Sequence, residues 1–167
     1  MLTKRRLRIE QATEEDIPLI LEFIRELARY ERGLDRVSAT EEGLRTTLFG
    51  SRPYAQALIV RENDEAVAFA IYYFSYTSFS AQPSLYLEDI FVRPTARHLG
   101  IGRQIMEFLV QRALERNCAR MEWSVLNWNQ QAIRFYENLA AEPVHDWTVF
   151  HLSSEKMAGL AQKTIQS

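Results

Sequence analysis

Two apolar stretches joined by a short polar turn constrain the fold of this chain most strongly. Residues 55–61 and 66–76 flank the turn Glu62-Asn63-Asp64-Glu65. Such a pair is typical of a β-hairpin. A third strand is predicted at residues 85–92, after a polar loop at 77–84 that contains Pro83. We therefore expect a central sheet built around this hairpin.

Helical patterns surround these strands. Apolar side chains recur at helical spacing from Ile17 onward, and the preceding Thr13-Glu14-Glu15-Asp16 resembles a capping box with an acidic first turn, which predicts a helix to about Gly33. Ile101, Ile105, Leu109 and Ala113 predict a second helix, over about 100–117. The remaining predicted elements are strands at 7–10, 121–126 and 144–152, and helices at 40–49 and 130–139. This order predicts an α/β (α+β) fold with one mixed, mostly antiparallel sheet flanked by helices.

Length and composition predict one globular domain. The 167 residues, of which 47% are hydrophobic, are enough for a single domain over 1–167 with its core at about 5–155. Cys118 is the single cysteine, so an intrachain disulfide is excluded. The basic start, residues 1–8, lacks the apolar region of a signal peptide, and no apolar run is long enough to cross a bilayer. We therefore expect a cytoplasmic protein without a membrane partner.

Charge and histidine spacing restrict the ligands. His98, His145 and His151 do not stand at metal-ligand spacing, so we expect no metal. The net charge is −2 and no long basic run occurs, which argues against nucleic acid as the main partner. A mildly acidic protein is compatible with a cationic substrate.

Two glycines mark a candidate anion site. A predicted strand ends at Val92, and Gly100 and Gly102 stand where the next helix begins. Glycine permits a positive φ and close approach of a ligand, while the free N–H groups and dipole of a helix start favour an anion. With Arg97 and Arg103 nearby, we expect a phosphate or pyrophosphate here. Ile105 replaces the third glycine of a dinucleotide fingerprint, and the P-loop lysine is missing, so an ordinary glycine-containing loop remains the alternative.

The segment Arg97-His98-Leu99-Gly100-Ile101-Gly102, after the strand that ends in Ile90-Phe91-Val92, resembles the signature of the GNAT superfamily of N-acetyltransferases. Residues 127–137 resemble its second block, in which an Asn-x-x-Ala segment opens a helix that carries Phe-Tyr. The resemblance implies the GNAT acyl-CoA acyltransferase fold and acetyl-CoA as co-substrate, with the pyrophosphate on the glycine turn and the pantetheine along the strand. The residues implied to contact acetyl-CoA are Ile90, Phe91, Val92, Arg97, His98, Leu99, Gly100, Ile101, Gly102, Arg103, Asn129 and Ala132.

Within this superfamily the chain is most similar to the diamine (spermidine/spermine) acetyltransferase branch. The similar segments are residues 26–31, 70–74, 86–92 and 128–129. The resemblance implies transfer of an acetyl group to a primary amine of a small molecule, in a protein that is typically a homodimer. Tyr30 and Glu31 match a substrate-binding pair of this branch, and residues 147–151 offer an apolar strand that could pair across a two-fold axis.

The chemistry of acetyl transfer assigns further roles. An alkyl ammonium has a pKa near ~10 and must lose a proton before it attacks a thioester. By resemblance Glu88 assists this deprotonation directly or through water, and Tyr136 protonates the leaving thiolate. Asp89 is a further substrate-binding candidate, which would point to the opposite face from Glu88 in a regular strand. A bulge in the strand would free a backbone N–H at residues 90–92 for the oxyanion.

The sequence differs from the diamine acetyltransferase branch at two places, and other functions are also compatible with it. The loop after Tyr72-Tyr73-Phe74 lacks the acidic residue and tryptophan of the polyamine enzymes, so a monoamine or amino-acid-like amine is also a candidate acceptor. His98 replaces an aromatic position of the pyrophosphate loop, with little expected loss because that loop acts through its backbone. The alternative functions are a non-catalytic acyl-CoA-binding regulatory module and a protein lysine or N-terminal acetylase. Without a site role, Glu88 and Glu31 would be solvated charges and Tyr136 a packing residue.

Overall fold

The computed structural model describes residues 6–165, which divide into two compact units with the boundary between Leu126 and Asn127. The first five residues of the basic N-terminal segment and the last two residues of the chain lie outside the described residues. The first unit contains every strand, and the second contains two helices and the segment between them. The single domain over 1–167 remains a prediction.

The first unit is built on a five-stranded sheet. Its strands are β1 Leu7–Gln11, β2 Gln56–Glu62, β3 Glu65–Thr77, β4 Gln82–Val92 and β5 Met121–Trp123, and they lie in the order β1-β2-β3-β4-β5. The first four strands pair antiparallel with their neighbours, whereas β5 pairs parallel with β4. The predicted mixed, mostly antiparallel sheet is thereby confirmed.

The two hairpins of the sheet differ in how well the sequence predicted them. The β2–β3 turn lies where expected, with Asn63 and Asp64 at φ 49° and 72°, the left-handed values of a tight turn. The predicted loop at 77–84 is only half right, because β3 continues to Thr77 and β4 already begins at Gln82, which leaves residues 78–81 between the strands. Pairing across the hairpin, with Thr77 opposite Gln82, outweighs the polar composition of this stretch.

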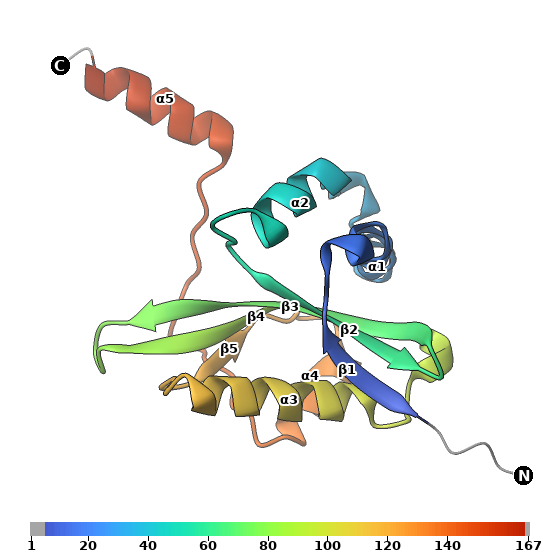
Figure 1. The fold of residues 1–167 in the computed structure, drawn as a ribbon. Helices are drawn as coiled ribbons and strands as arrows, with labels where there is room; N and C mark the ends of the chain where they lie inside the picture. Colours follow the sequence, from blue (N-terminus) through green and yellow to red (C-terminus); the bar gives the residue numbers. More distant parts are fainter. Residues whose placement is uncertain (1–5, 166–167) are drawn as a thin grey trace, which may run out of the picture. The chain divides into compact units, whose positions relative to one another are not determined.

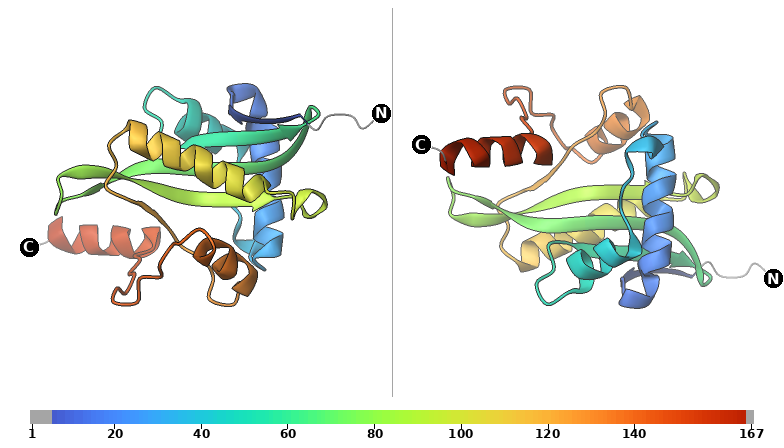
Figure 2. Two further views of the ribbon diagram at one scale, coloured as in Figure 1. Left: turned by 90° about the horizontal axis from the view of Figure 1, so that it is seen from below. Right: turned by 90° about the horizontal axis from the view of Figure 1, so that it is seen from above.

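Helices cover both faces of this sheet. Helices α1 Ile17–Tyr30 and α2 Glu41–Phe49 lie on one face, and α3 Ile101–Glu115 lies on the other (Figures 1 and 2). We call the face beneath α1 and α2 the α1 face. Its core includes Phe23 of α1, whose ring stacks on that of Phe69 at 5.1 Å between centroids. The helices predicted from Ile17 and from about residue 100 are therefore confirmed.

Local side chains explain where the first two helices begin. Asp16 Oδ2 accepts a hydrogen bond of 2.9 Å from Thr13 N, in the short 3₁₀ turn Glu14–Asp16 that leads into α1, which confirms the capping box. At α2, Thr40 Oγ1 accepts from Gly43 N at 3.1 Å. Each bond satisfies a backbone donor that a helix leaves free at its start.

The second unit contains α4 Gln130–Glu137 and α5 Ser154–Ile165. The predicted strand at 144–152 is wrong, because no strand forms there and Val149 and Phe150 are each 89% exposed. β-propensity needs a partner strand to act, and within the described residues none pairs with this segment. Helix α5 was not predicted. Ser153 was the available sequence signal, because serine is a preferred N-cap residue, and its Oγ accepts a hydrogen bond from Lys156 N at 3.4 Å.

Residues 6–165 contain neither a candidate membrane-spanning helix nor a candidate metal-binding cluster. None of their helices is both long and apolar enough to cross a membrane. Nor do they bring together three or more His, Cys, Asp or Glu side chains in an arrangement that could hold a metal ion.

Candidate active site

A β-bulge in β4 shapes the candidate site. Ile71 of β3 pairs with Asp89, but the next residue of β3, Tyr72, pairs with Leu87. Glu88 is therefore an extra residue on β4 with no partner on β3. Such a bulge bends a strand and changes the direction of its side chains. A free N–H at residues 90–92 was predicted on the condition of a bulge in this strand, and the strand does contain a bulge, at residue 88.

The bulge places Asp89 on a defined face of the sheet, within range of the charge of Glu88. Ile71 and Tyr73 alternate on one face of β3, so their partners Asp89 and Tyr86 share that face. This is the α1 face, because Ile71 belongs to the core beneath α1. Glu88 acts on the same groups, since its charge raises the pKa of both Tyr73 and Asp89. Opposite faces for Glu88 and Asp89 were predicted for a regular strand, and the bulge shows that this condition is not met here.

Three carboxylates, Glu31, Glu88 and Asp89, form what we call the acidic cluster. Burial, together with the charges of Glu88 and Glu31, raises the pKa of Asp89 to about 6. Burial also raises the pKa of Glu31, against the opposing charge of Arg36. Three like charges in a partly desolvated place repel one another, so a bound cation would relieve an existing electrostatic cost.

Tyr30 stands at the end of α1, next to the acidic cluster. Its ring lies 6.4 Å from that of Phe91, tilted by 57°, and Glu31 follows it at the C-cap of the helix. The structure thus brings the predicted pair Tyr30 and Glu31 beside the β4 carboxylates, across 57 or more residues of sequence. An aromatic ring beside carboxylates is a suitable environment for an ammonium group.

Two arginines join the end of β4 to α1. Arg93 donates to Glu22 at 2.6 Å, to Glu26 at 2.7 Å and to the Ala66 carbonyl at 3.0 Å. Sequence reasoning missed Arg93, although two glutamates at i, i+4 spacing on one helix face signal a site for a basic partner.

Arg97 behaves differently from Arg93. Its Nε donates to the Val92 carbonyl at 2.9 Å, and its guanidinium lies 5.0 Å from the ring centre of Tyr30 and 5.4 Å from that of Phe91. Arg97 was expected to add positive charge to the glycine turn. Its side chain is instead folded back onto the aromatic residues beside the acidic cluster.

The glycine turn has the backbone geometry of an anion site. His98 and Gly100 adopt left-handed conformations, at φ 62° and 77°, which turn the chain sharply into α3. No side chain caps α3, and a Cβ added to Gly100 would meet no atom within 4 Å. Gln104 N donates to the Gly100 carbonyl, so the N–H groups of 101–103 precede the first helical bond. These open donors fit a pyrophosphate.

Arg103 is the second basic residue predicted for this turn. It lies in the first turn of α3, where its exposed side chain donates to Glu107 at 2.8 Å. The positive charge of Arg103 is therefore partly balanced by a carboxylate one helical turn away.

The last part of β4 has a free edge. Ile90, Phe91 and Val92 pair with β3 on one side, whereas β5 pairs only with residues 85–87. Within residues 6–165, no strand pairs with the other edge of β4 at 90–92. Backbone groups that point to this edge can bind an extended chain such as pantetheine, in the manner of a peptide strand.

The predicted residues Asn129, Ala132 and Tyr136 belong to the second unit. Asn129 is buried, and its Oδ1 accepts from Ala132 N at 3.2 Å, which caps the start of α4. Tyr136 lies on α4 with its ring 5.2 Å from that of Phe135. Capping gives Asn129 a structural role, while its contact with acetyl-CoA and the catalytic role of Tyr136 remain predictions.

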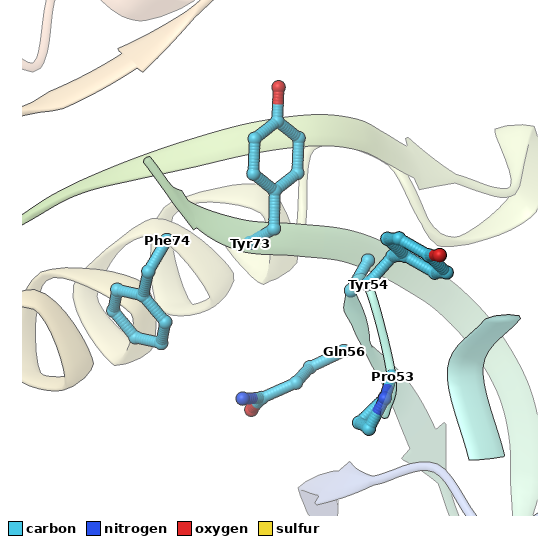
Figure 3. Close-up of a pocket in the computed structure, with 6 residues that line it drawn as sticks. Pro53, Tyr54, Gln56, Tyr73 and Phe74 are labelled. Carbon is cyan, nitrogen blue, oxygen red and sulfur yellow. The ribbon is translucent and has the colours of Figure 1, made fainter. Parts of the chain in front are cut away.

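A cavity of about 200 Å³ lies where β2 begins, lined by Pro53, Tyr54, Ala55, Gln56, Tyr73 and Phe74 (Figure 3). Tyr73 and Phe74 point to opposite sides of β3. Tyr73 stacks on Tyr86 at 5.1 Å, and the pKa of its hydroxyl is raised by burial and then by the charge of Glu88. Among the described residues no charged side chain lines the cavity, so this lining does not offer the carboxylates that suit a cationic amine.

Comparison with curated proteins identifies similar enzymes. The chain is 36% identical to thialysine N-epsilon-acetyltransferase from Bos taurus, over 93% of this chain and 97% of that one. It is 30% identical to L-ornithine N5-acetyltransferase from Arabidopsis thaliana, over 95% and 89% of the two chains. It is also 34% identical to spermidine/spermine N(1)-acetyltransferase-like protein 1 from Homo sapiens, over 92% of this chain and 24% of that longer one.

The fold and the family agree with these similarities. An integron cassette protein from the mobile metagenome of V. cholerae superposes with a TM-score of 0.78 and 25% identity, over 93% of this chain and 98% of that chain. Residues 20–140 match the acetyltransferase (GNAT) family. The chain is therefore an N-acetyltransferase that belongs to the GNAT family, and it is similar to members of the diamine acetyltransferase branch.

Proposed function

We propose that this protein transfers an acetyl group from acetyl-CoA to the primary amine of a small molecule that carries a second ammonium group. The observation that carries this proposal is the acidic cluster beside Tyr30, at the end of β4 that leads to the glycine turn. A diammonium compound presents one group to be acetylated and a second that carboxylates and an aromatic ring can hold.

The acceptor is a short diamine or an amino-acid-like diamine rather than a long polyamine. Relatives are named for thialysine, for ornithine and for spermidine/spermine, which all carry more than one amine. The tip of the β3–β4 hairpin, residues 78–81, has no acidic side chain, and Phe79 there is fully exposed. A polyamine would lack an anchor at this position, which favours the shorter compounds.

The glycine turn and the free edge of β4 bind the acetyl donor. Backbone N–H groups at 101–103 hold the pyrophosphate, and peptide groups of Ile90–Val92 hold the pantetheine arm. When bound, acetyl-CoA supplies an activated acetyl group as a thioester. The bulge at Glu88 leaves a backbone group outside the β3–β4 ladder, and an N–H there would stabilise negative charge on the acetyl oxygen.

Glu88 accepts the proton of the substrate ammonium, directly or through one water molecule. It is exposed at the bulge and can therefore exchange its proton with solvent after each turnover. Asp89, with its pKa raised to about 6, is mostly ionised at neutral pH and holds the cation beside it. Removing the substrate proton leaves a neutral amine that can attack the thioester.

Tyr136 donates a proton to the sulfur as CoA leaves. A tyrosine hydroxyl has a pKa of ~10 and a thiol one of ~8.5, so this transfer is not strongly uphill. Tyr136 follows Ile133 by three residues and the N-cap residue Asn129 by seven, and this spacing on α4 matches the family motif. A cytoplasmic location remains a prediction from the composition of the sequence, and a homodimeric state remains a prediction from the resemblance.

A matched pair of amines tests the proposal. Release of CoA would be followed with 1,4-diaminobutane and with 1-aminobutane, which differ in the second ammonium group, and then with thialysine, ornithine and spermidine. We expect the diamine to have a kcat/KM at least about tenfold higher than the monoamine, because one charge-assisted contact is worth roughly 1.5–3 kcal/mol. Equal values for the two compounds would refute recognition of a second ammonium group.

Tyr136→Phe provides the companion test. It should lower kcat by about 10²-fold or more while the Kd for CoA, measured by calorimetry, stays unchanged. A variant with full kcat would remove Tyr136 from the mechanism. Acetylation of peptides but of none of the amines would instead indicate a protein acetylase.

A further inference from the structure

We propose that Arg97 couples the two ligands of this enzyme, so that binding of CoA at the glycine turn raises the affinity for the amine at Tyr30. The part that concerns the amine rests on the proposed function. The guanidinium of Arg97 lies over the Tyr30 and Phe91 rings, although the backbone of Arg97 begins the glycine turn.

The contrast with Arg93 shows why Arg97 can respond to a ligand. Positions 22, 26 and 30 recur every four residues, so they lie along one face of α1. The first two positions carry Glu22 and Glu26, which both pair with Arg93 and hold its guanidinium in place. Arg97 meets only an aromatic ring at the third position. Its Nε donates to the Val92 carbonyl, and no carboxylate pairs with its guanidinium among the described residues.

An anion at the glycine turn would compete for this guanidinium. An arginine carries five N–H donors, and a pyrophosphate accepts charge-assisted bonds more strongly than a carbonyl does. The bound anion would either draw the guanidinium away from Tyr30 or neutralise its charge. In both cases the positive charge over the ring falls.

The amine benefits from the same change. An ammonium group held by the acidic cluster would share the ring of Tyr30, because Glu31 is the residue next to it. Without CoA, the positive charge of Arg97 repels that ammonium and occupies the ring. When CoA is bound, both the repulsion by Arg97 and its competition for the ring decrease, so the two ligands bind with positive cooperativity. Thermodynamic linkage requires that the amine raises the affinity for CoA by the same factor.

Calorimetry with CoA, which does not turn over, measures this coupling. The Kd of 1,4-diaminobutane would be determined with and without saturating CoA for the wild type, Arg97→Gln and Arg103→Gln. A cation–π contact at a partly exposed site corresponds to roughly a two- to fivefold change in an equilibrium constant, which sets the expected effect of CoA on the wild type. In R97Q the amine should already bind that much more tightly without CoA, and CoA should change it no further.

R103Q is the matched control, because it removes one positive charge near the same turn from a side chain paired with Glu107 rather than with Tyr30. It should weaken CoA binding yet keep the coupling. Coupling that persists in R97Q, or amine binding that weakens in R97Q without CoA, would overturn the proposal. If R97Q does not fold, Tyr30→Leu serves instead: it must abolish the coupling, and CoA should bind at least as tightly as it does to the wild type, because the ring that competes for the guanidinium is gone.

A second readout does not depend on the amine. In protein labelled with 3-fluorotyrosine, the ¹⁹F signal of Tyr30, assigned through Tyr30→Phe, should shift when CoA is added. The shift should be lost in R97Q and kept in R103Q. A protein that shows this pattern but acetylates no amine would refute the proposed function and leave the link between Arg97 and Tyr30 standing, whereas an unmoved Tyr30 signal would refute that link.

Discussion

The α1 face of the sheet is a packed core on one side of the bulge and a polar site on the other. Phe69 and its partner Phe91 are buried beneath α1, where Phe69 stacks on Phe23. Beyond Ile71, the next residue on this face, Tyr73, is only half-buried, and Glu88 is exposed. The same two strands therefore build both regions.

The difference teaches how a fold can place charge next to its core. In the core region, apolar side chains exclude water and supply the free energy of packing. At the bulge, one extra residue shifts the alternation of β4, so that Asp89 lies on the α1 face with Glu88 next to it in the chain. Burial close to the core then raises the pKa of Asp89, which ties the chemistry of the site to the stability of the fold.

The largest expected effect is on stability. Phe69→Ala removes a fully buried ring that stacks on Phe23, and should lower the free energy of unfolding by about 3–5 kcal/mol. Urea denaturation measures this change. The kcat of the fraction that remains folded should stay within about twofold of the wild type, because a change to the core touches no reacting group. A large fall in kcat under conditions in which all of the variant is folded would show that the core region also affects catalysis.

The opposite result is expected at the bulge. Glu88→Gln should lower kcat by about 10²-fold or more, since general-base catalysis typically contributes 10²–10⁴-fold. Its free energy of unfolding should change by less than about 0.5 kcal/mol, because the side chain is exposed. Steady-state kinetics and urea denaturation give the two values.

Glu122→Gln is the control for this variant. Glu122 pairs with Tyr86 across β4 and β5, lies on the same face, and forms an ion pair with Arg120. Glu122→Gln replaces a carboxylate by an amide, as Glu88→Gln does, but at a residue outside the bulge. This variant should leave kcat nearly unaltered. Equal losses in the two variants would indicate a general effect of charge rather than proton transfer by Glu88.

The smallest expected effect links the two regions through pH. The pKa of Asp89 is raised from 3.8 to about 6, so the folded state binds its proton more tightly than the unfolded state does. The ionised form therefore costs stability, which should fall as pH rises from about 4 to 6, by at most about 3 kcal/mol. Asp89→Asn should remove this dependence and stabilise the protein by about 1–3 kcal/mol at pH 8. Unfolding curves from pH 4 to 8 would measure it, and a variant less stable at pH 8 would contradict the assignment.

Much of the site could be predicted from the sequence, because its motifs are local. The glycine turn depends on Gly100 at a positive φ and on the helix that starts there, and both follow from neighbouring residues. Tyr30 and Glu31 were recognised by resemblance to a family. Arg93 was missed, because its partners Glu22 and Glu26 lie more than 60 residues away in the sequence.

The sequence by itself determined the periodic helices α1 and α3, the β2–β3 hairpin and the family, since these depend on spacing and turn chemistry within short segments. Only the tertiary structure decided the register of β4 on β3, and with it the bulge at Glu88 and the face of Asp89. It also decided that residues 144–152 form no strand. The physical reason is the same in each case: a strand takes its register and its very existence from a partner that is distant in the sequence, whereas a helix or a tight turn satisfies its own backbone.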